Sequence, residues 1–90
     1  MGMSAVRFKI MPESLDVELD GLHKSAKEII EKMGGVYSSG EEEPIAFGLK
    51  ALIISLAYPE EKEIDELEGE LAKISGVSSV EMIDYRRAIG

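Results

Sequence analysis

Cysteine, asparagine, glutamine, threonine and tryptophan are all missing from this chain of 90 residues. The absence of cysteine excludes disulfides, thiolate nucleophiles and zinc sites built on cysteine. Proteins of hyperthermophiles avoid Asn, Gln and Cys and are enriched in Glu and Lys, and both of these charged residues are abundant here. The composition therefore indicates a thermophilic source.

Long hydrophobic runs are missing as well. The sequence has no stretch of 18 apolar residues, so it predicts no membrane-spanning helix. The N-terminus lacks a basic region followed by an apolar one, which argues against a secretory signal. Ninety residues are enough for one modest core and too few for two. We therefore expect a single domain covering residues 1–90, located in the cytoplasm and without a membrane partner.

Positive charge is scarce, because 10 basic residues face 18 acidic ones and give a net charge of −8. Phosphate backbones attract clustered Lys and Arg, so no direct nucleic-acid partner is expected. An acidic module suits a basic protein surface, since complementary potentials speed encounter. The same charge also serves solubility, and composition leaves these two interpretations open.

Candidates for chemistry are few. The chain has one histidine, His23, which lies at the edge of an apolar helical stripe and is expected to be structural. The run Glu41–Glu43 would bind a hard cation only with further ligands, so we interpret it as a solvated charge run. No nucleophile elbow or phosphate-binding glycine loop occurs. We expect no metal site, no cofactor and no bond-making chemistry.

Periodicity predicts alternating strands and helices. Val6, Phe8 and Ile10 alternate with basic residues as in a strand with one apolar face, and residues 11–14 end it. Apolar residues from Leu19 to Met33 recur at helical spacing, with Asp16 as the expected N-cap and Gly34-Gly35 as the stop.

The second half continues this alternation. We expect an edge strand at residues 36–38, an acidic loop, and a long apolar strand at residues 48–58. Apolar spacing then predicts a helix at residues 64–74 and a last strand at residues 77–85. This order predicts an α+β fold of the ferredoxin-like βαββαβ type, with a four-stranded antiparallel sheet and two helices on one face. The first and third strands would be central, and the open face would carry Arg7 and Lys9.

Phe47 stands between Ala46 and Gly48, just before the long strand. Such small neighbours leave its ring unshielded, so Phe47 either caps the core or projects from the surface. Physical grounds alone favour burial, because large aromatics next to strands usually bury themselves.

Three segments of the chain resemble elongation factor 1-beta, the guanine-nucleotide exchange factor of archaeal and eukaryotic translation. PIAFGLKAL at residues 44–52 is similar to the corresponding segment of this family. VRFKIMPES at residues 6–14 resembles the first strand and turn of its archaeal members, and GVSSVEMIDYRR at residues 76–87 resembles their last strand. The matches occur in the right order and span the chain.

The resemblance implies that this chain promotes exchange of GDP for GTP on elongation factor 1-alpha, a GTPase. It also implies that Phe47 inserts into that GTPase beside its nucleotide and Mg²⁺ site. Small neighbours would let the two backbones approach closely. The residues expected to shape the loop around Phe47 are Pro44, Ile45, Ala46, Gly48, Glu42 and Glu43.

The end of the sequence departs from the eukaryotic pattern. Eukaryotic members have a lysine very near the C-terminus that reaches toward the Mg²⁺ and phosphate region, whereas this chain ends in Ala88-Ile89-Gly90. That ending resembles archaeal members. Arg86 and Arg87 are candidate contacts to an acidic surface of the partner, or they rest on the strand edge.

Two other functions remain open at this point. An RNA-binding module can have the same topology, but it needs paired aromatics on the central strands, which this sequence does not supply. A small-ligand or oligomerising module would bury the face around Ala51 and Ile53 in a dimer.

Overall fold

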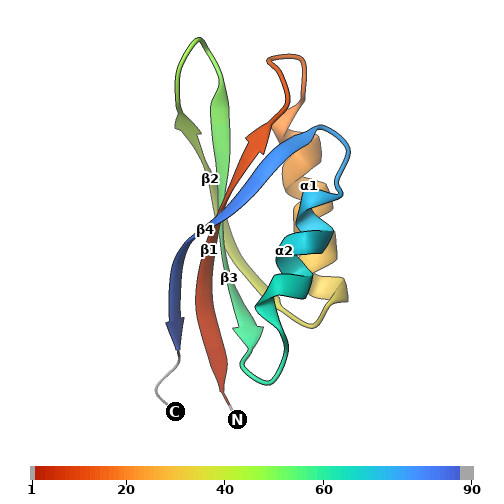
Figure 1. Ribbon diagram of the computed structural model, residues 1–90, viewed down its shortest axis with the longest axis vertical. Coiled ribbons are helices and arrows are strands. Elements are labelled where there is room, and N and C mark those ends of the chain that lie inside the picture. The colour runs from red at the N-terminus through yellow and green to blue at the C-terminus, as the bar shows by residue number, and fades with distance from the viewer. Residues whose placement is uncertain (1, 88–90) are drawn as a thin grey trace.

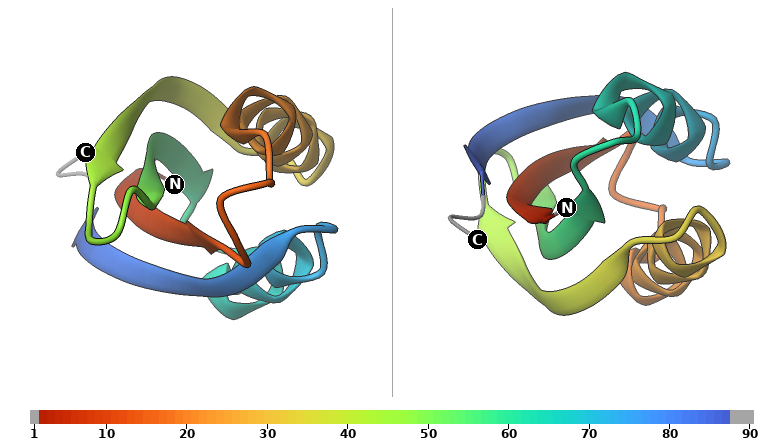
Figure 2. Two further views of the ribbon diagram at one scale, coloured as in Figure 1. Left: turned by 90° about the horizontal axis from the view of Figure 1, so that it is seen from above. Right: turned by 90° about the horizontal axis from the view of Figure 1, so that it is seen from below.

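The computed structural model describes residues 2–87 and forms six elements from them. They are β1 (Met3–Pro12), α1 (Leu19–Lys32), β2 (Val36–Pro44), β3 (Lys50–Pro59), α2 (Ile64–Ala72) and β4 (Val77–Arg87). The four strands form one antiparallel sheet in the order β2-β3-β1-β4. Figures 1 and 2 show that both helices cover the same face of this twisted sheet. The predicted ferredoxin-like fold, with its first and third strands central, is confirmed.

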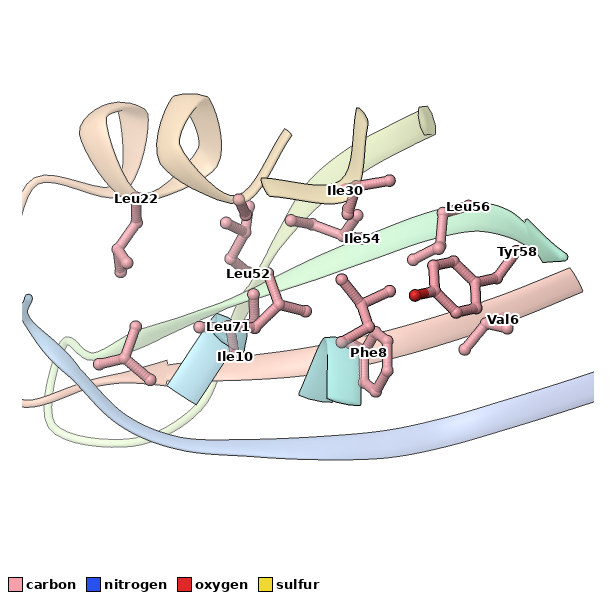
Figure 3. Packing of buried hydrophobic residues seen from close by; sticks show 13 residues of the cluster. Val6, Phe8, Ile10, Leu22, Ile30, Leu52, Ile54, Leu56, Tyr58 and Leu71 are labelled. Atoms are coloured by element: carbon pink, nitrogen blue, oxygen red, sulfur yellow. The ribbon is translucent and has the colours of Figure 1, made fainter. Parts of the chain in front are cut away.

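The core lies between the central strands and the two helices. Alternate residues of β1 and β3 point to the helices and are almost completely buried, as Phe8 and Ile54 illustrate. Figure 3 shows these side chains meeting Leu22 and Ile30 of α1 and Leu71 of α2. The period of two along the strands and the helical spacing therefore place apolar side chains on facing surfaces.

The opposite face of the sheet is not covered by helices, yet its centre is closed to water. Ala51 and Ile53 of β3 lie on this face and are 0% and 2% exposed. Arg7 and Lys9 of the neighbouring β1 reach over β3 toward carboxylates of β2. The prediction that both basic residues occupy this face is confirmed. Because Ala51 and Ile53 are already buried within one chain, they leave little apolar surface for a dimer.

Both helices begin and end close to their predicted limits. The N-cap of α1 is Glu18, so the expected Asp16 is wrong, and the backbone N–H of Asp16 instead donates to Ser14 Oγ in the preceding turn. Gly34 follows the C-cap at a φ of 94°, the left-handed conformation with which helices commonly end. Within the described residues, neither helix is long and apolar enough to cross a membrane.

The largest difference from the sequence-based expectation is in β2. A short strand at residues 36–38 was expected, but β2 runs from Val36 to Pro44, and Glu41, Glu42 and Glu43 lie in it rather than in a loop. Acidic residues are uncommon in strands, so their sequence does not indicate this extension. The terminal Ala88, Ile89 and Gly90, where the expected departure from the eukaryotic ending falls, lie outside the described residues.

Candidate functional site: the tip of the β2–β3 hairpin

The loop between β2 and β3, residues 45–49, forms one end of the molecule and is called the tip loop here (Figure 1). Leu49 N–H donates to Ala46 O at 2.9 Å, which closes a four-residue turn with Phe47 and Gly48 at its centre. Ile45 N–H donates to Leu49 O at 2.8 Å below the turn. Phe47 has a φ of 55° and Gly48 a φ of 81°. Positive φ at both central positions is the signature of the type I′ turns that connect tight hairpins.

Phe47 is in an unfavourable position in two respects. Its side chain is 94% exposed, and it is the one non-glycine residue with positive φ among the described residues. A bulky residue in the left-handed region costs about 1–2 kcal/mol, and such strain concentrates at functional sites. The interpretation that Phe47 caps the core is wrong, and its projection from the surface is confirmed.

The hairpin below the tip loop is braced by ion pairs. Glu43 Oε1 lies 3.9 Å from Lys9 Nζ, and Glu41 Oε1 lies 3.0 Å from Arg7 Nη2, both across the uncovered face. Glu42, on the helix-covered side, has its Oε1 3.6 Å from Lys50 Nζ. Each exposed pair contributes little free energy singly. Together they hold the end of β2 to the central strands, so the three carboxylates are not simply solvated.

The other residues expected around Phe47 gather at the same end. Pro44 is the last residue of β2, and Ala46 and Gly48 flank the ring without covering it. Ile45 is 40% exposed. Leu15, which was not among the residues expected at this site, lies in the β1–α1 loop and is 65% exposed. A leucine between the polar residues of a predicted turn is the signal that could have identified it.

Arg86 and Arg87 are not part of this cluster. They end β4, and Figure 1 shows that this end of the strand is opposite to the tip loop. The molecule is 42 Å along its longest axis and 20 and 18 Å along the others. Arg86 Nε lies 3.3 Å from Asp84 Oδ2 on the same strand. The two groups of predicted partner-binding residues are therefore separated by nearly the whole length of the fold.

His23 has structural contacts, as predicted. Its Nε2 forms a hydrogen bond with the hydroxyl of Tyr37, and the two rings are 5.4 Å apart between centroids. Lys27 Nζ lies 5.1 Å from the centroid of the Tyr37 ring. These contacts attach α1 to β2. Across residues 2–87, no three histidine or carboxylate side chains are placed to share a metal ion.

Comparison with known proteins identifies relatives over almost the whole chain. Residues 5–87 match the model of the EF-1 guanine nucleotide exchange domain. The chain is 43% identical over 88 residues to elongation factor 1-beta of Methanosarcina mazei, a match covering 97% of this chain and 99% of the relative. It is 41% identical to elongation factor 1-beta of Methanothermobacter thermautotrophicus, with 97% and 98% covered.

Similar solved structures support the fold. The C-terminal domain of the MgtC protein from Mycobacterium tuberculosis has a TM-score of 0.72 at 11% identity, covering 97% of this chain and 89% of that one. The ACT domain of GTP pyrophosphokinase from Chlorobium tepidum has a TM-score of 0.65 at 17% identity, covering 90% and 99%. At such low identity these similarities concern architecture only.

Proposed function

This chain belongs to the family of EF-1 guanine nucleotide exchange domains, and we propose that it acts on the GTPase elongation factor 1-alpha through its tip loop. The family has a nucleotide exchange role in translation elongation. In our proposal, Phe47 inserts into the GTPase near its nucleotide and Mg²⁺ site and favours the form that has released GDP. GTP, which is then free to bind, completes the exchange.

The free-energy requirement for this mechanism is simple. Each tenfold loss of nucleotide affinity requires about 1.4 kcal/mol of differential binding between the exchange factor and the two forms of the GTPase. The coupling is reciprocal, so binding of GTP lowers the affinity of the GTPase for the exchange factor to the same extent and releases it. Burial of one exposed phenylalanine side chain provides about 1.5–3 kcal/mol. Phe47 therefore has enough apolar surface to contribute a substantial part of the required coupling.

The observation that carries the proposal is the conformation of Phe47. The ring is 94% exposed and its backbone has a φ of 55°. Neither property stabilises the isolated domain, whereas both are useful if the ring enters a partner. The small side chains of Ala46 and Gly48 would allow the partner's surface to approach the turn closely.

The remaining candidate residues have supporting roles in this proposal. Pro44 and Ile45 set the direction in which the loop leaves β2, and Ile45 adds exposed apolar surface next to Phe47. Glu42 and Glu43 are paired with Lys50 and Lys9, so we assign them to stiffening the hairpin. Arg86 and Arg87 would contact a different part of the partner, since they lie at the opposite end of the molecule.

The domain would act without making or breaking covalent bonds. Its place of action is the cytoplasm, where elongation factors work. The tip loop supplies shape and apolar surface, and the nucleotide and Mg²⁺ are held by the GTPase.

Release of a fluorescent GDP analogue from archaeal elongation factor 1-alpha tests the proposal. The wild-type domain should accelerate release, and Phe47→Ala should abolish most of the acceleration while its melting temperature stays close to that of the wild type. Val36→Ala is the matched control, because it truncates another exposed apolar side chain, 57% exposed, at the far end of β2 from the tip loop, and it should accelerate release like the wild type. A wild-type domain that leaves the release rate unchanged would refute the proposed function.

A further inference from the structure

Leu15 is a large apolar side chain with no role in the core and 65% of its surface exposed. Isolated exposed apolar residues are common on monomers and need no explanation. Leu15 is not isolated. A Cβ placed on Gly48 would lie 3.4 Å from Leu15 Cδ2, so Leu15 rests against the tip loop at the residue next to Phe47. Figure 1 shows the β1–α1 loop and the tip loop at the same end of the molecule.

The loop that carries Leu15 has a defined conformation. Glu13 N–H donates to Gly76 O at 2.8 Å, which attaches the beginning of the loop to the segment before β4. Val17 N–H donates to Ser14 O at 3.3 Å, and the side chain of Val17 packs against the core. These contacts fix the backbone on both sides of Leu15. Its exposure is therefore a property of the folded loop.

Leu15 and the tip loop together form an apolar surface. Leu15, Ile45 and Phe47 are all exposed large apolar residues at this end. A hollow of about 130 Å³ lies between the two loops, with Leu15 and Gly48 in its lining. Of the carboxylates at this end, Glu42 and Glu43 are paired with basic side chains of the sheet, whereas Glu13 and Asp16 are exposed in the same loop as Leu15. The surface at this end thus combines three exposed apolar side chains with the exposed carboxylates of Glu13 and Asp16 beside Leu15.

We propose that Leu15 is a second partner-binding residue, which contacts an apolar surface of the GTPase adjacent to the position that receives Phe47. This inference rests on the proposed function and extends the contact from one loop to two. The partner surface must offer an apolar area wide enough for side chains from both loops. Leu15 would add affinity and orientation, whereas Phe47 would couple binding to nucleotide release.

A titration of the exchange rate against the concentration of this domain separates these roles. Leu15→Ser should raise the half-saturating concentration about fivefold to tenfold, in line with the loss of one well-packed interface side chain, and should leave the maximal rate unchanged. Leu15→Met, which keeps an apolar side chain of similar size, should titrate like the wild type. Val36→Ser is the matched control, because Val36 is also an exposed aliphatic residue, 57% exposed, at the far end of the same hairpin.

Each outcome decides for or against the role of Leu15. If Leu15→Ser titrates like the wild type while Phe47→Ala is defective, the inference fails and the proposed function stands. An equal loss for Val36→Ser, or a melting temperature lowered enough to explain the loss, would also overturn it. If the wild type itself does not accelerate release, the proposed function and this inference fail together.

Discussion

At the scale of single residues, Phe47 and Gly48 form a turn in which one residue fits the backbone and the other does not. Gly48 adopts its φ of 81° without a steric penalty. Phe47 has a Cβ and a ring, so its φ of 55° is costly. The sequence best suited to such a turn is Asn-Gly. The chain therefore departs from the most stable sequence at the residue that we propose to contact the partner.

Phe47→Asn should separate stability from function. Asparagine tolerates the left-handed conformation, so relief of part of the penalty of about 1–2 kcal/mol for a bulky residue there should raise the free energy of unfolding. Exchange activity should be lost, because the ring is gone. Denaturant unfolding and the GDP-release assay measure the two effects. Lower stability of the variant would show that Phe47 makes favourable contacts in the isolated domain, contrary to its exposure.

Tyr58 makes the stability of the domain sensitive to alkaline pH. Burial, together with the nearby carboxylate of Glu66, raises the pKa of Tyr58 above its ordinary value of 10.0. The unfolded chain then loses the tyrosine proton at lower pH than the folded one. The stabilisation of the folded domain that this raised pKa provides is complete below about pH 10, and it is lost as the pH rises through the folded-state pKa.

Tyr58→Phe removes this titration. The unfolding free energies of the wild type and the variant, measured between about pH 9 and about pH 11, should therefore converge or cross as pH rises, because only the wild type has this loss. A difference between the two proteins that stays constant over this range would contradict the assignment.

At the scale of elements, the contact between α1 and β2 depends on Gly40. A Cβ at this position would lie 2.6 Å from His23 Nε2 and 3.0 Å from the Tyr37 hydroxyl. Gly40→Ala should therefore force apart the hydrogen bond between these side chains and lower the free energy of unfolding by about 1–3 kcal/mol. Denaturant unfolding provides the measurement.

Gly69 in α2 is the matched control. Nothing lies within 4 Å of a Cβ placed there, and alanine favours a helix over glycine by roughly 0.5–1 kcal/mol. Gly69→Ala should therefore be more stable than the wild type. If both alanine variants change stability in the same direction, steric contact at Gly40 is not the cause.

The elements also show how far sequence reasoning reaches. Apolar periodicity was sufficient for β1 and both helices, because their burial repeats with the period of the element, whereas β3 was found from its unbroken apolar run, which is buried on both faces of the sheet. The extension of β2 through Glu41–Glu43 could not be found in this way, since the bases that pair with these acids come from β1 and β3. The outward direction of the Phe47 side chain could not be predicted either, because it follows from the positive φ of the turn. The family resemblance, and not periodicity, drew attention to Phe47.

At the scale of the whole molecule, the fold is a rod with a candidate contact at each end. The tip loop and the arginines at the end of β4 lie at opposite ends of the 42 Å axis. A partner that contacts both ends must extend along the domain. The net charge of −8, carried by the whole chain, produces an electric field that acts on an approaching partner before contact is made.

The charge predicts a salt dependence of the exchange reaction. If the partner surface is basic, raising the ionic strength shortens the Debye length from about 30 Å at about 0.01 M to about 3 Å at about 1 M. Exchange at limiting concentrations of the domain should then slow by at least severalfold, whereas the maximal rate should change little, because steering acts mainly on encounter. Stopped-flow measurements at several salt concentrations distinguish the two parameters. If the exchange rate at limiting concentrations of the domain does not change with salt, the charge serves solubility only.

The sheet order also has a consequence for the speed of folding. β2 and β3 are adjacent in the chain and pair from Pro44 and Lys50 onward, whereas Ser4 of β1 must find Arg87 of β4. A local hairpin forms in about 1–10 μs, and pairing of distant segments is slower because a large loop must close first. The turn that begins the fast step is the one that Phe47 strains. If this hairpin is already formed in the transition state, Phe47→Asn should refold faster than the wild type in stopped-flow measurements, whereas a hairpin that forms later would change mainly the unfolding rate. The aromatic ring at the tip would then set the pace at which this sheet starts to form.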